Sequence, residues 1–315
     1  MAREWRLKAL TDLWTGDADG KGQCTIPTGL LGSIRWWFEV LVRGLGGAAC
    51  DPSESNNRCP DQQGRRYVVC ELFGCTGWGR KFRFEVRGGN GAVMRDQIKK
   101  DTEFILRFTP LRPIAAQEWA LLDLTLRLIA DYGALGGKTV LKPSDEATRS
   151  GLPHHHDYGI VKVEQRAGIQ ACSQADLERY VRDGRWRKPP QQDFAWASLT
   201  NFWCVNGRHL ARQSADKSTF NKVLGRKEPK TQGQQLASND RVNRWLAGRQ
   251  QESKKIFSFR SPPRTFGFQS PGAVHFKMIK KRLCKAWKDD GFKDEEFMTG
   301  AAILARLMTQ AGVAP

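Results

Sequence analysis

Hydrophobic and polar residues alternate along three short stretches in the first half of the chain, and a fourth β-rich run follows them. A period of two is typical of a strand that buries one face. The stretch in which Phe82, Phe84 and Val86 alternate with charged residues is the clearest case. The predicted strands cover residues 4–10, 81–87, 104–108 and 158–164.

Two segments between these strands repeat their hydrophobic residues at helical spacing instead. Residues 117–132 form one predicted helix. Residues 33–45 form the other, with Arg35, Glu39 and Arg43 four residues apart on its polar face, where ion pairs stabilise a helix.

The start of the helix at residues 33–45 is a candidate phosphate site. Gly29 and Gly32 allow a tight turn, and Ser33 is the predicted N-cap. A helix N-terminus presents unbonded backbone N–H groups and the positive end of its dipole to an anion. An ordinary capped helix behind an ordinary turn is the alternative.

The order strand, helix, strand, strand, helix, strand is the βαββαβ, ferredoxin-like arrangement, which RNA-recognition domains also use. The second half of the chain repeats this order less clearly, with a turn at Ser261-Pro262-Pro263. We therefore predict the α+β class, with two ferredoxin-like domains packed together. The remaining predicted elements are strands at 195–205, 256–260 and 265–268 and helices at 175–184, 216–224, 240–249, 275–288 and 298–310.

The boundary between the two domains is expected near residue 168. Residues 1–168 form the first domain, with an irregular, cysteine-containing insertion near residues 48–79. Residues 169–315 form a divergent, basic second domain that ends in helices.

Charge distinguishes the two halves of this 315-residue chain. Its net charge is +18, and residues 161–315 hold 29 Lys and Arg against 14 Asp and Glu. Such an excess indicates a polyanionic partner, most commonly nucleic acid, and an anionic membrane surface is the weaker alternative. Because the sequence has no apolar signal region and no run of 18 apolar residues, we predict a cytoplasmic protein without a membrane partner.

Eight cysteines in a cytoplasmic chain are expected to be thiols or metal ligands rather than disulfides. Cys50, Cys59, Cys70 and Cys75 fall within 26 residues, where a zinc ion would hold an insertion that lacks its own core. No C-x-x-C pair supports such a site, so buried or loop thiols are the alternative. We expect no required cofactor, and structural zinc at these cysteines is the one candidate.

The segment Gly133-Ala-Leu-Gly-Gly-Lys-Thr resembles a phosphate loop. It is not a Walker A motif, because that motif needs a glycine where Tyr132 stands and follows a strand rather than a helix. A helix-ending turn is the alternative. The residues suited to lie against a nucleic-acid backbone are Gly136, Gly137, Lys138 and Thr139.

Histidines give no catalytic pattern. The cluster His154-His155-His156-Asp157 lacks metal-ligand spacing and is expected to be a solvated loop, and His209 stands alone. No nucleophile is paired with a base in the sequence, so no catalytic residue is predicted.

Basic and aromatic residues alternate over Lys254–Phe268, where Phe257 and Phe259 share one strand face. Proteins that bind single strands combine cationic grooves with stacking rings in this way. Since alternating Phe residues usually mark a buried face, we expect the rings in the core and only the cations at RNA. A second basic run extends over Arg208–Lys230.

Four pieces of the sequence together resemble a known family. They are Leu10-Thr-Asp-Leu-Trp-Thr-Gly-Asp-Ala-Asp-Gly, Gly32-Ser-Ile-Arg-Trp-Trp-Phe-Glu, Cys70-Glu-Leu-Phe-Gly-Cys-Thr-Gly-Trp-Gly-Arg-Lys-Phe and Gly133-Ala-Leu-Gly-Gly-Lys-Thr. In this order they resemble the subunit-one family of the type III-B CRISPR (Cmr) RNA-targeting complex, within the RAMP superfamily. Lys254–Phe268 extends the resemblance over nearly the whole chain. One departure follows Thr139, because the family's Gly-Phe-Gly-like segment is delayed here to Tyr158-Gly159.

The resemblance implies a non-catalytic, RNA-binding subunit of an antiviral ribonucleoprotein. Such a subunit holds the 3′ part of the guide RNA and its paired target RNA at the end of the effector filament, beside neighbouring RAMP subunits that cut the target. The predicted RNA-binding residues are Gly32, Ser33, Arg35, Arg43, Arg80, Lys81, Gly136, Gly137, Lys138, Thr139, Lys254, Lys255, Arg260 and Arg264.

Two other functions stay open at this point. A metal-independent RAMP endoribonuclease would process guide-RNA precursors with His209 or His155 as general base. A metal-stabilised protein-interaction module around Cys50–Cys75 is the third hypothesis.

Overall fold

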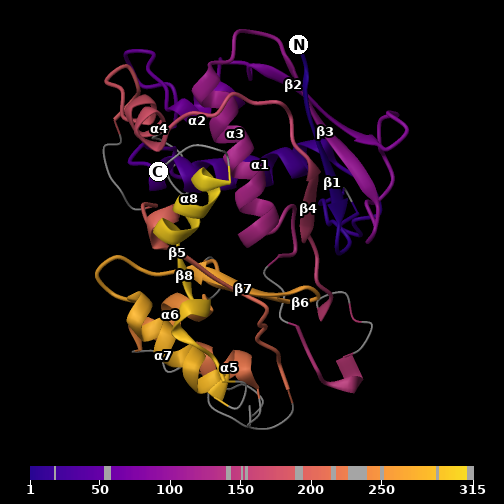
Figure 1. Cartoon of the computed structure of the whole chain (residues 1–315), viewed down its shortest axis with the longest axis vertical. Helices are drawn as coiled ribbons and strands as arrows, with labels where there is room; N and C mark the ends of the chain where they lie inside the picture. Colours follow the sequence, from indigo (N-terminus) through magenta and orange to yellow (C-terminus); the bar gives the residue numbers. More distant parts are fainter. Residues whose placement is uncertain are drawn as a thin grey trace. The chain divides into compact units, whose positions relative to one another are not determined.

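The alternating residues near the N-terminus form an inner strand of a four-stranded antiparallel sheet (Figure 1). β1 (Arg3–Ala9) lies between β3 (Glu103–Pro110) and β4 (Val161–Gln165), and β2 (Phe82–Gly88) pairs with the other side of β3. The order β2-β3-β1-β4 is that of a ferredoxin-like sheet.

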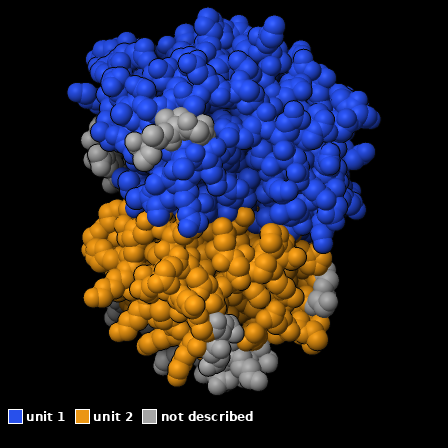
Figure 2. Space-filling model, in the orientation of Figure 1, with its two compact units in different colours: residues 1–137, 158–200, 301–315 blue, residues 138–157, 201–300 orange. Residues whose placement is uncertain are grey.

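The computed structural model describes residues 1–17, 19–52, 58–139, 143–149, 152, 155–188, 194–213, 218–225, 240–248, 252–288 and 291–310. The chain forms two compact units, coloured separately in Figure 2. Unit 1 comprises residues 1–137, 158–200 and 301–315, and unit 2 comprises residues 138–157 and 201–300.

Helices α1 (Pro27–Gly44) and α3 (Ala116–Tyr132) lie against one face of the first sheet (Figure 1). The Trp5 ring of β1 lies 6.3 Å from the Trp119 ring of α3, between ring centroids, and Trp5 is fully buried. Unit 1 also contains α2 (Val68–Phe73), α4 (Gln174–Val181) and most of α8 (Gly300–Thr309).

The start of α1 differs from the sequence prediction. The helix begins at Pro27 with Ile26 as its N-cap, so Ser33 lies inside the helix and the predicted Ser33 cap is wrong. Proline at the first position presets the helical φ and needs no N–H partner, which moves the start six residues earlier. At the other end of the helix, Gly46 has a positive φ of 86° directly after the C-cap residue Leu45, as is common where helices end.

The insertion near residues 48–79 is not irregular throughout. It contains α2, whose six residues include four apolar ones and five that are buried. A helix of this length has too few turns to show a period in the sequence, and its stability comes from packing rather than propensity.

Unit 2 holds a second four-stranded antiparallel sheet in the order β6-β7-β5-β8, which matches the order of the first. This confirms the prediction of two ferredoxin-like domains in an α+β protein. Its strands are β5 (Phe202–Asn206), β6 (Ile256–Arg260), β7 (Pro263–Phe268) and β8 (Met298–Thr299). Its helices are α5 (Thr219–Leu224), α6 (Arg241–Ala247) and α7 (Phe276–Ala286).

Two predictions in unit 2 need correction. β8 covers two residues that were predicted to begin a helix, and β5 is shorter than the predicted strand at 195–205, because residues 199–201 form a 3₁₀ turn. β8 is defined by pairing of Met298 and Thr299 with Cys204 and Trp203, and two residues carry no periodic signal.

The core of unit 2 lies between its sheet and its helices. Trp203, Phe220 and Leu283 are buried there, together with Ile279 and Trp287 of the amphipathic segment around α7. Among the described residues, no helix is long and apolar enough to cross a bilayer.

Candidate nucleic-acid interface

The glycine-rich loop after α3 is fixed to the loop after β1 and to α1. The Gly136 N–H donates to Ser33 Oγ at 3.0 Å, and the Gly137 N–H donates to the Trp14 carbonyl at 2.8 Å. Gly136 has a φ of +93°, and a Cβ there would lie 2.6 Å from the Trp14 carbonyl oxygen. Only glycine fits this close approach.

Tyr158 and Gly159 complete the same arrangement. The Leu135 N–H donates to the Gly159 carbonyl at 2.7 Å, and the Gly159 N–H donates to the Asp12 carbonyl at 2.9 Å. The Trp14 and Tyr158 rings pack edge to face at 6.0 Å. We call the group formed by residues 12–14, 33, 135–137, 158 and 159 the glycine junction.

The backbone donors predicted to meet phosphate at the start of α1 are engaged elsewhere. Gly32 and Ser33 lie inside the helix, where each N–H bonds to the preceding turn. The N–H groups of Gly136 and Gly137 bond within the glycine junction. Gly32 is exposed, and Lys138 and Thr139, which follow the junction, are half-buried.

Arg35 and Arg43 use their guanidinium groups inside unit 1. Arg35 donates to the Gly74 carbonyl at 2.9 Å and to Cys70 Sγ at 3.3 Å. Arg43 donates to the carbonyls of Cys50, at 3.0 Å, and Ala197, at 3.2 Å. The polar face of α1 therefore holds the cysteine-containing segment in place.

Glu39 lies between these two arginines as the sequence predicts. It pairs with Arg35 at 3.2 Å and with Arg43 at 3.8 Å, and the residue is 8% exposed. Burial raises the pKa of the Glu39 carboxyl, although both guanidinium groups act to lower it.

Arg80 and Lys81 also have internal partners. Arg80 Nε donates to the Phe82 carbonyl at 3.0 Å. Lys81 Nζ pairs with Glu118 at 2.9 Å and with Glu71 at 3.2 Å, which joins α2, the start of β2 and α3.

The four cations of the Lys254–Phe268 stretch that are predicted to bind RNA differ in exposure. Lys255 is buried, with Nζ donating to the Ser253 carbonyl at 2.6 Å, and Arg264 is buried beside β5. Lys254 lies over the Phe220 ring at 4.8 Å. Arg260 is exposed and pairs with Asp145 at 3.1 Å.

The Phe257 and Phe259 rings are buried, as expected. Both stack on Phe266 of the neighbouring strand, with centroids 5.0 and 5.7 Å apart. Within this structure the rings therefore stabilise the sheet of unit 2, and no base has access to them.

A row of exposed lysines on α7 was not included among the predicted site residues. Lys277, Lys281 and Lys285 are four residues apart, and all are exposed. The helical spacing of these lysines in the sequence is the signal that would have identified them. Arg282 of the same helix has internal partners, because it donates to Asn243 Oδ1 at 2.6 Å and to the Val223 carbonyl at 2.9 Å.

Three of the four predicted candidate metal ligands come together in unit 1. The Sγ atoms of Cys50, Cys59 and Cys70 all lie within 4.8 Å of one another, and those of Cys50 and Cys70 are 3.5 Å apart. Cys75 lines the same pocket. We call these four residues the cysteine cluster.

Hydrogen bonds make Cys59 the most acidic thiol of the cysteine cluster. Contacts with Cys50 and Cys70, the Tyr67 N–H and the Arg187 guanidinium lower the pKa of Cys59 to about 3. The same contacts with Cys50 and Cys59 raise the pKa of Cys70.

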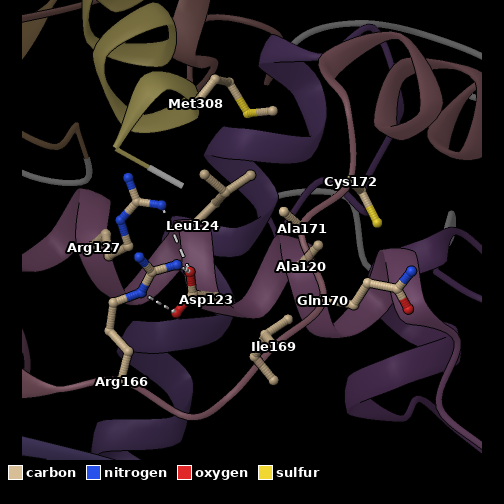
Figure 3. A pocket seen from close by; sticks show the side chains of 10 residues that line it. All are labelled: Ala120, Asp123, Leu124, Arg127, Arg166, Ile169, Gln170, Ala171, Cys172 and Met308. Carbon is tan, nitrogen blue, oxygen red and sulfur yellow. Dashed lines mark hydrogen bonds and ion pairs between the residues drawn. The ribbon is translucent and has the colours of Figure 1, made fainter. Parts of the chain in front are cut away.

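A cluster of charged side chains surrounds Asp123 of α3 in unit 1 (Figure 3). Its carboxylate accepts hydrogen bonds from Trp5 Nε1 at 2.9 Å and from Arg166 Nη2 at 2.5 Å, and Arg127 Nη1 lies 3.6 Å away. The adjoining cavity measures about 20 Å³, which is room for one water molecule. This cluster neutralises buried charge and has no space for a substrate.

The described histidines lie in unit 2. His155 Nε2 lies 3.4 Å from Arg149 Nη1, and the His209 carbonyl accepts from Trp287 Nε1 at 2.9 Å. Asp157 accepts from the N–H groups of Arg260 and Ser261 and thereby holds the β6–β7 turn. His154 and the parts of the Arg208–Lys230 run at 214–217 and 226–230 lie outside the described residues.

A family model matches a large part of the first unit. Residues 6–141, which run from β1 through the glycine junction, match the family model of the RAMP superfamily. This match supports the superfamily that the sequence resemblance predicts. None of the curated proteins matches the sequence.

Solved structures of CRISPR proteins are similar to the chain at low identity. The crystal structure of Cmr1 from Pyrococcus furiosus (apo form) has 11% identity and a TM-score of 0.43, over 87% of this chain and 89% of that chain. A chain of the type III-B Cmr-beta complex bound to cognate target RNA and AMPPnP has 10% identity and a TM-score of 0.45, over 92% and 99%. A chain of the Csm3-Csm4 subcomplex of the type III-A complex has 13% identity and a TM-score of 0.24, over 57% and 93%.

Proposed function

We propose that this protein is a non-catalytic, RNA-binding structural subunit of a type III-B CRISPR effector complex. It would hold the 3′ part of the guide RNA and its paired target RNA, next to other RAMP subunits. The RAMP match over residues 6–141 supports the superfamily, and the motif resemblance supports the particular subunit.

One observation carries this proposal. The four sequence pieces that resemble the subunit-one family are far apart in the chain, yet hydrogen bonds join them into one region of unit 1. Trp14 contacts Gly137, Ser33 contacts Gly136, and Arg35 contacts the piece that begins at Cys70. A family signature that converges in space indicates one shared site rather than four unrelated similarities.

RNA contacts in this proposal go mainly to the backbone. Positive charge for phosphates comes from Lys138, which follows the glycine junction, from Arg260 at the end of β6 and from the three exposed lysines of α7. The half-buried Arg43 and the buried Arg264 of the predicted set act by positioning the segments that they bond. Such contacts bind guide and target largely without regard to sequence.

The test is a titration of end-labelled single-stranded RNA and of a guide–target duplex with the full chain at several salt concentrations, in the presence of Mg²⁺. Each sample is then run on a denaturing gel. We expect binding that weakens steeply with salt and RNA that stays intact, because phosphate contacts release counterions.

Discrete RNA cleavage that is lost in His209→Ala or His155→Ala would overturn the proposal in favour of the endoribonuclease. Absence of binding to either RNA at low salt would overturn it as well. Binding that is strong for one sequence and weak for unrelated ones would contradict backbone recognition.

A further inference from the structure

Three thiols in unit 1 have the separation that a tetrahedral metal ion requires. A Zn–S distance of about 2.3 Å places the sulfurs of a tetrahedral site about 3.8 Å apart. The Sγ atoms of Cys50, Cys59 and Cys70 lie within 4.8 Å of one another, with one pair at 3.5 Å. Small side-chain rotations would therefore bring all three into contact with one ion.

The segment that carries these thiols has only a small separate core around them. Its separate core consists of Cys59, Tyr67 and Cys70, with Ala48, Cys50 and Cys75 packed against it. Four of these six residues are cysteines, so the separate core contains few large apolar side chains. Small substructures without an adequate core are commonly stabilised by a structural metal.

Hydrogen-bond donors are directed at the sulfurs of the cluster. The Tyr67 N–H donates to Cys59 Sγ at 3.4 Å, Arg35 Nη2 donates to Cys70 Sγ at 3.3 Å, and Arg187 Nη1 lies 3.9 Å from Cys59 Sγ. Neutral thiols are weak acceptors, whereas thiolates bound to a metal accept such bonds well. Two guanidinium groups would also offset the negative charge of a zinc–thiolate centre.

The turn after α2 brings a fourth thiol to the same pocket. Gly74 ends the helix with a φ of 87°, and a Cβ there would lie 2.9 Å from the Arg80 N–H nitrogen and the Trp78 carbonyl oxygen. This tight turn places Cys75 beside the other three thiols, where it lines the pocket and packs against the small core.

We propose that Cys50, Cys59, Cys70 and Cys75 bind one structural zinc ion. The first three residues supply the ligands that already lie together, and Cys75 supplies the fourth. Four thiolates in tetrahedral geometry favour zinc over oxygen-binding cations. The ion would fasten the segment between α1 and β2 onto the polar face of α1, and this does not depend on RNA binding.

The first experiment measures the metal content of the full chain, purified without chelator and desalted. Mass spectrometry of the intact protein under non-denaturing conditions is expected to show one bound zinc per chain. The apo chain titrated with Co²⁺ is expected to develop thiolate-to-cobalt charge-transfer absorption and the visible bands of a tetrahedral site.

Variants identify the ligands. Cys59→Ser and Cys70→Ser should lose zinc and the cobalt charge-transfer absorption, and Cys75→Ser should bind zinc more weakly than the unmodified chain. Cys24→Ser is the matched control, because Cys24 is an exposed cysteine of unit 1 outside the cluster, and it should keep the zinc.

Three results would overturn the proposal. One is wild-type chain that carries no zinc and gives no cobalt–thiolate absorption. Another is a Cys59→Ser chain with the zinc content of the Cys24→Ser control. The third is a zinc-free chain in which peptide mapping finds a disulfide between two cysteines of the cluster.

Discussion

At the scale of single residues, buried charges in this protein depend on their partners. Asp123 is 3% exposed and is held by Trp5 and Arg166, with Arg127 beside it. Removing one partner of a buried ionic cluster leaves the others uncompensated in a low-dielectric environment. The stability of unit 1 therefore depends on this carboxylate.

We predict that Asp123→Ala lowers the free energy of unfolding by about 3–5 kcal/mol. Urea denaturation followed by circular dichroism measures the change. The matched control is Glu103→Ala, whose ion pair with Arg6 is exposed and is worth about 0–1 kcal/mol. Equal effects of the two variants would contradict the assigned role of Asp123.

At alkaline pH, the free energy of unfolding depends on the titration of the buried Lys255. Burial lowers the pKa of its ammonium group from 10.5 to about 8, while the nearby Glu252 carboxylate acts to raise it. Between pH 8 and 10.5 the unfolded chain therefore holds more protons than the folded chain, so folding becomes more favourable as pH rises.

We predict that this stability gain, at most about 3 kcal/mol, is absent in Lys255→Met. Chemical denaturation of both chains at a series of pH values across this interval gives the two slopes. Parallel slopes for the wild-type chain and the variant would show that Lys255 is not the group responsible.

At the scale of elements, Gly32 and Gly136, which belong to two of the sequence pieces that carry the family resemblance, differ in their structural roles. Gly136 has a positive φ and lies against the Trp14 carbonyl, whereas Gly32 lies inside α1, where a Cβ would have no other atom within 4 Å. We predict that Gly136→Ala destabilises the protein by at least about 1–2 kcal/mol through its left-handed backbone alone. Gly32→Ala should stabilise it by about 0.5–1 kcal/mol, because alanine favours a helix interior.

Thermal denaturation of the two alanine variants checks this contrast. Both variants should also be titrated with RNA, since Gly32 and Gly136 belong to the predicted RNA-binding set. A destabilising Gly32→Ala would indicate that the residue lies outside the helix, as the sequence had suggested.

Sequence patterns predicted those elements whose residues carry the signal themselves. α3 shows its helical period, and the turn between β6 and β7 is marked by Ser261-Pro262-Pro263. The start of α1 was misjudged because Ser33 is a common N-cap type, whereas Pro27 actually begins the helix. β8 could not be found because two residues have no period.

The candidate site was harder to predict than the strands and helices. Its four motif pieces were recognised, but no local rule indicates that Ser33 would bond to Gly136 or Trp14 to Gly137. The cysteine cluster has no C-x-x-C pair, because its thiols come from separate segments of the chain rather than from one short metal-binding turn. Long-range contacts of this kind arise from tertiary packing, which a single sequence does not display.

At the scale of the whole molecule, positive charge is concentrated in the second half of the sequence, and α7 presents part of it. Lys277, Lys281 and Lys285 are exposed along one side of the helix, while Ile279 and Leu283 are in the core. These three exposed lysines can be replaced without disturbing the buried residues of the same helix. This makes α7 a direct test of electrostatic RNA binding.

We predict that the triple variant Lys277→Ala, Lys281→Ala and Lys285→Ala folds normally and weakens RNA binding to a similar degree for unrelated sequences. The slope of log K against log salt should fall by about 0.7 for each lost phosphate contact with single-stranded RNA. Arg179→Ala is the control, since Arg179 is exposed but already paired with Asp176. An unchanged slope in the triple variant would exclude α7 from the RNA-binding surface.

Because unit 1 contains both early and late residues of the chain, the two units are completed in a fixed order during synthesis. Unit 1 begins at the first residue but includes residues 301–315, whereas all of unit 2 has been made by residue 300. Arg127 in α3 donates to the Leu307 carbonyl of α8, so its partner leaves the ribosome 180 residues later. The unit that starts first is therefore completed last, because its final helix is made only after all of unit 2.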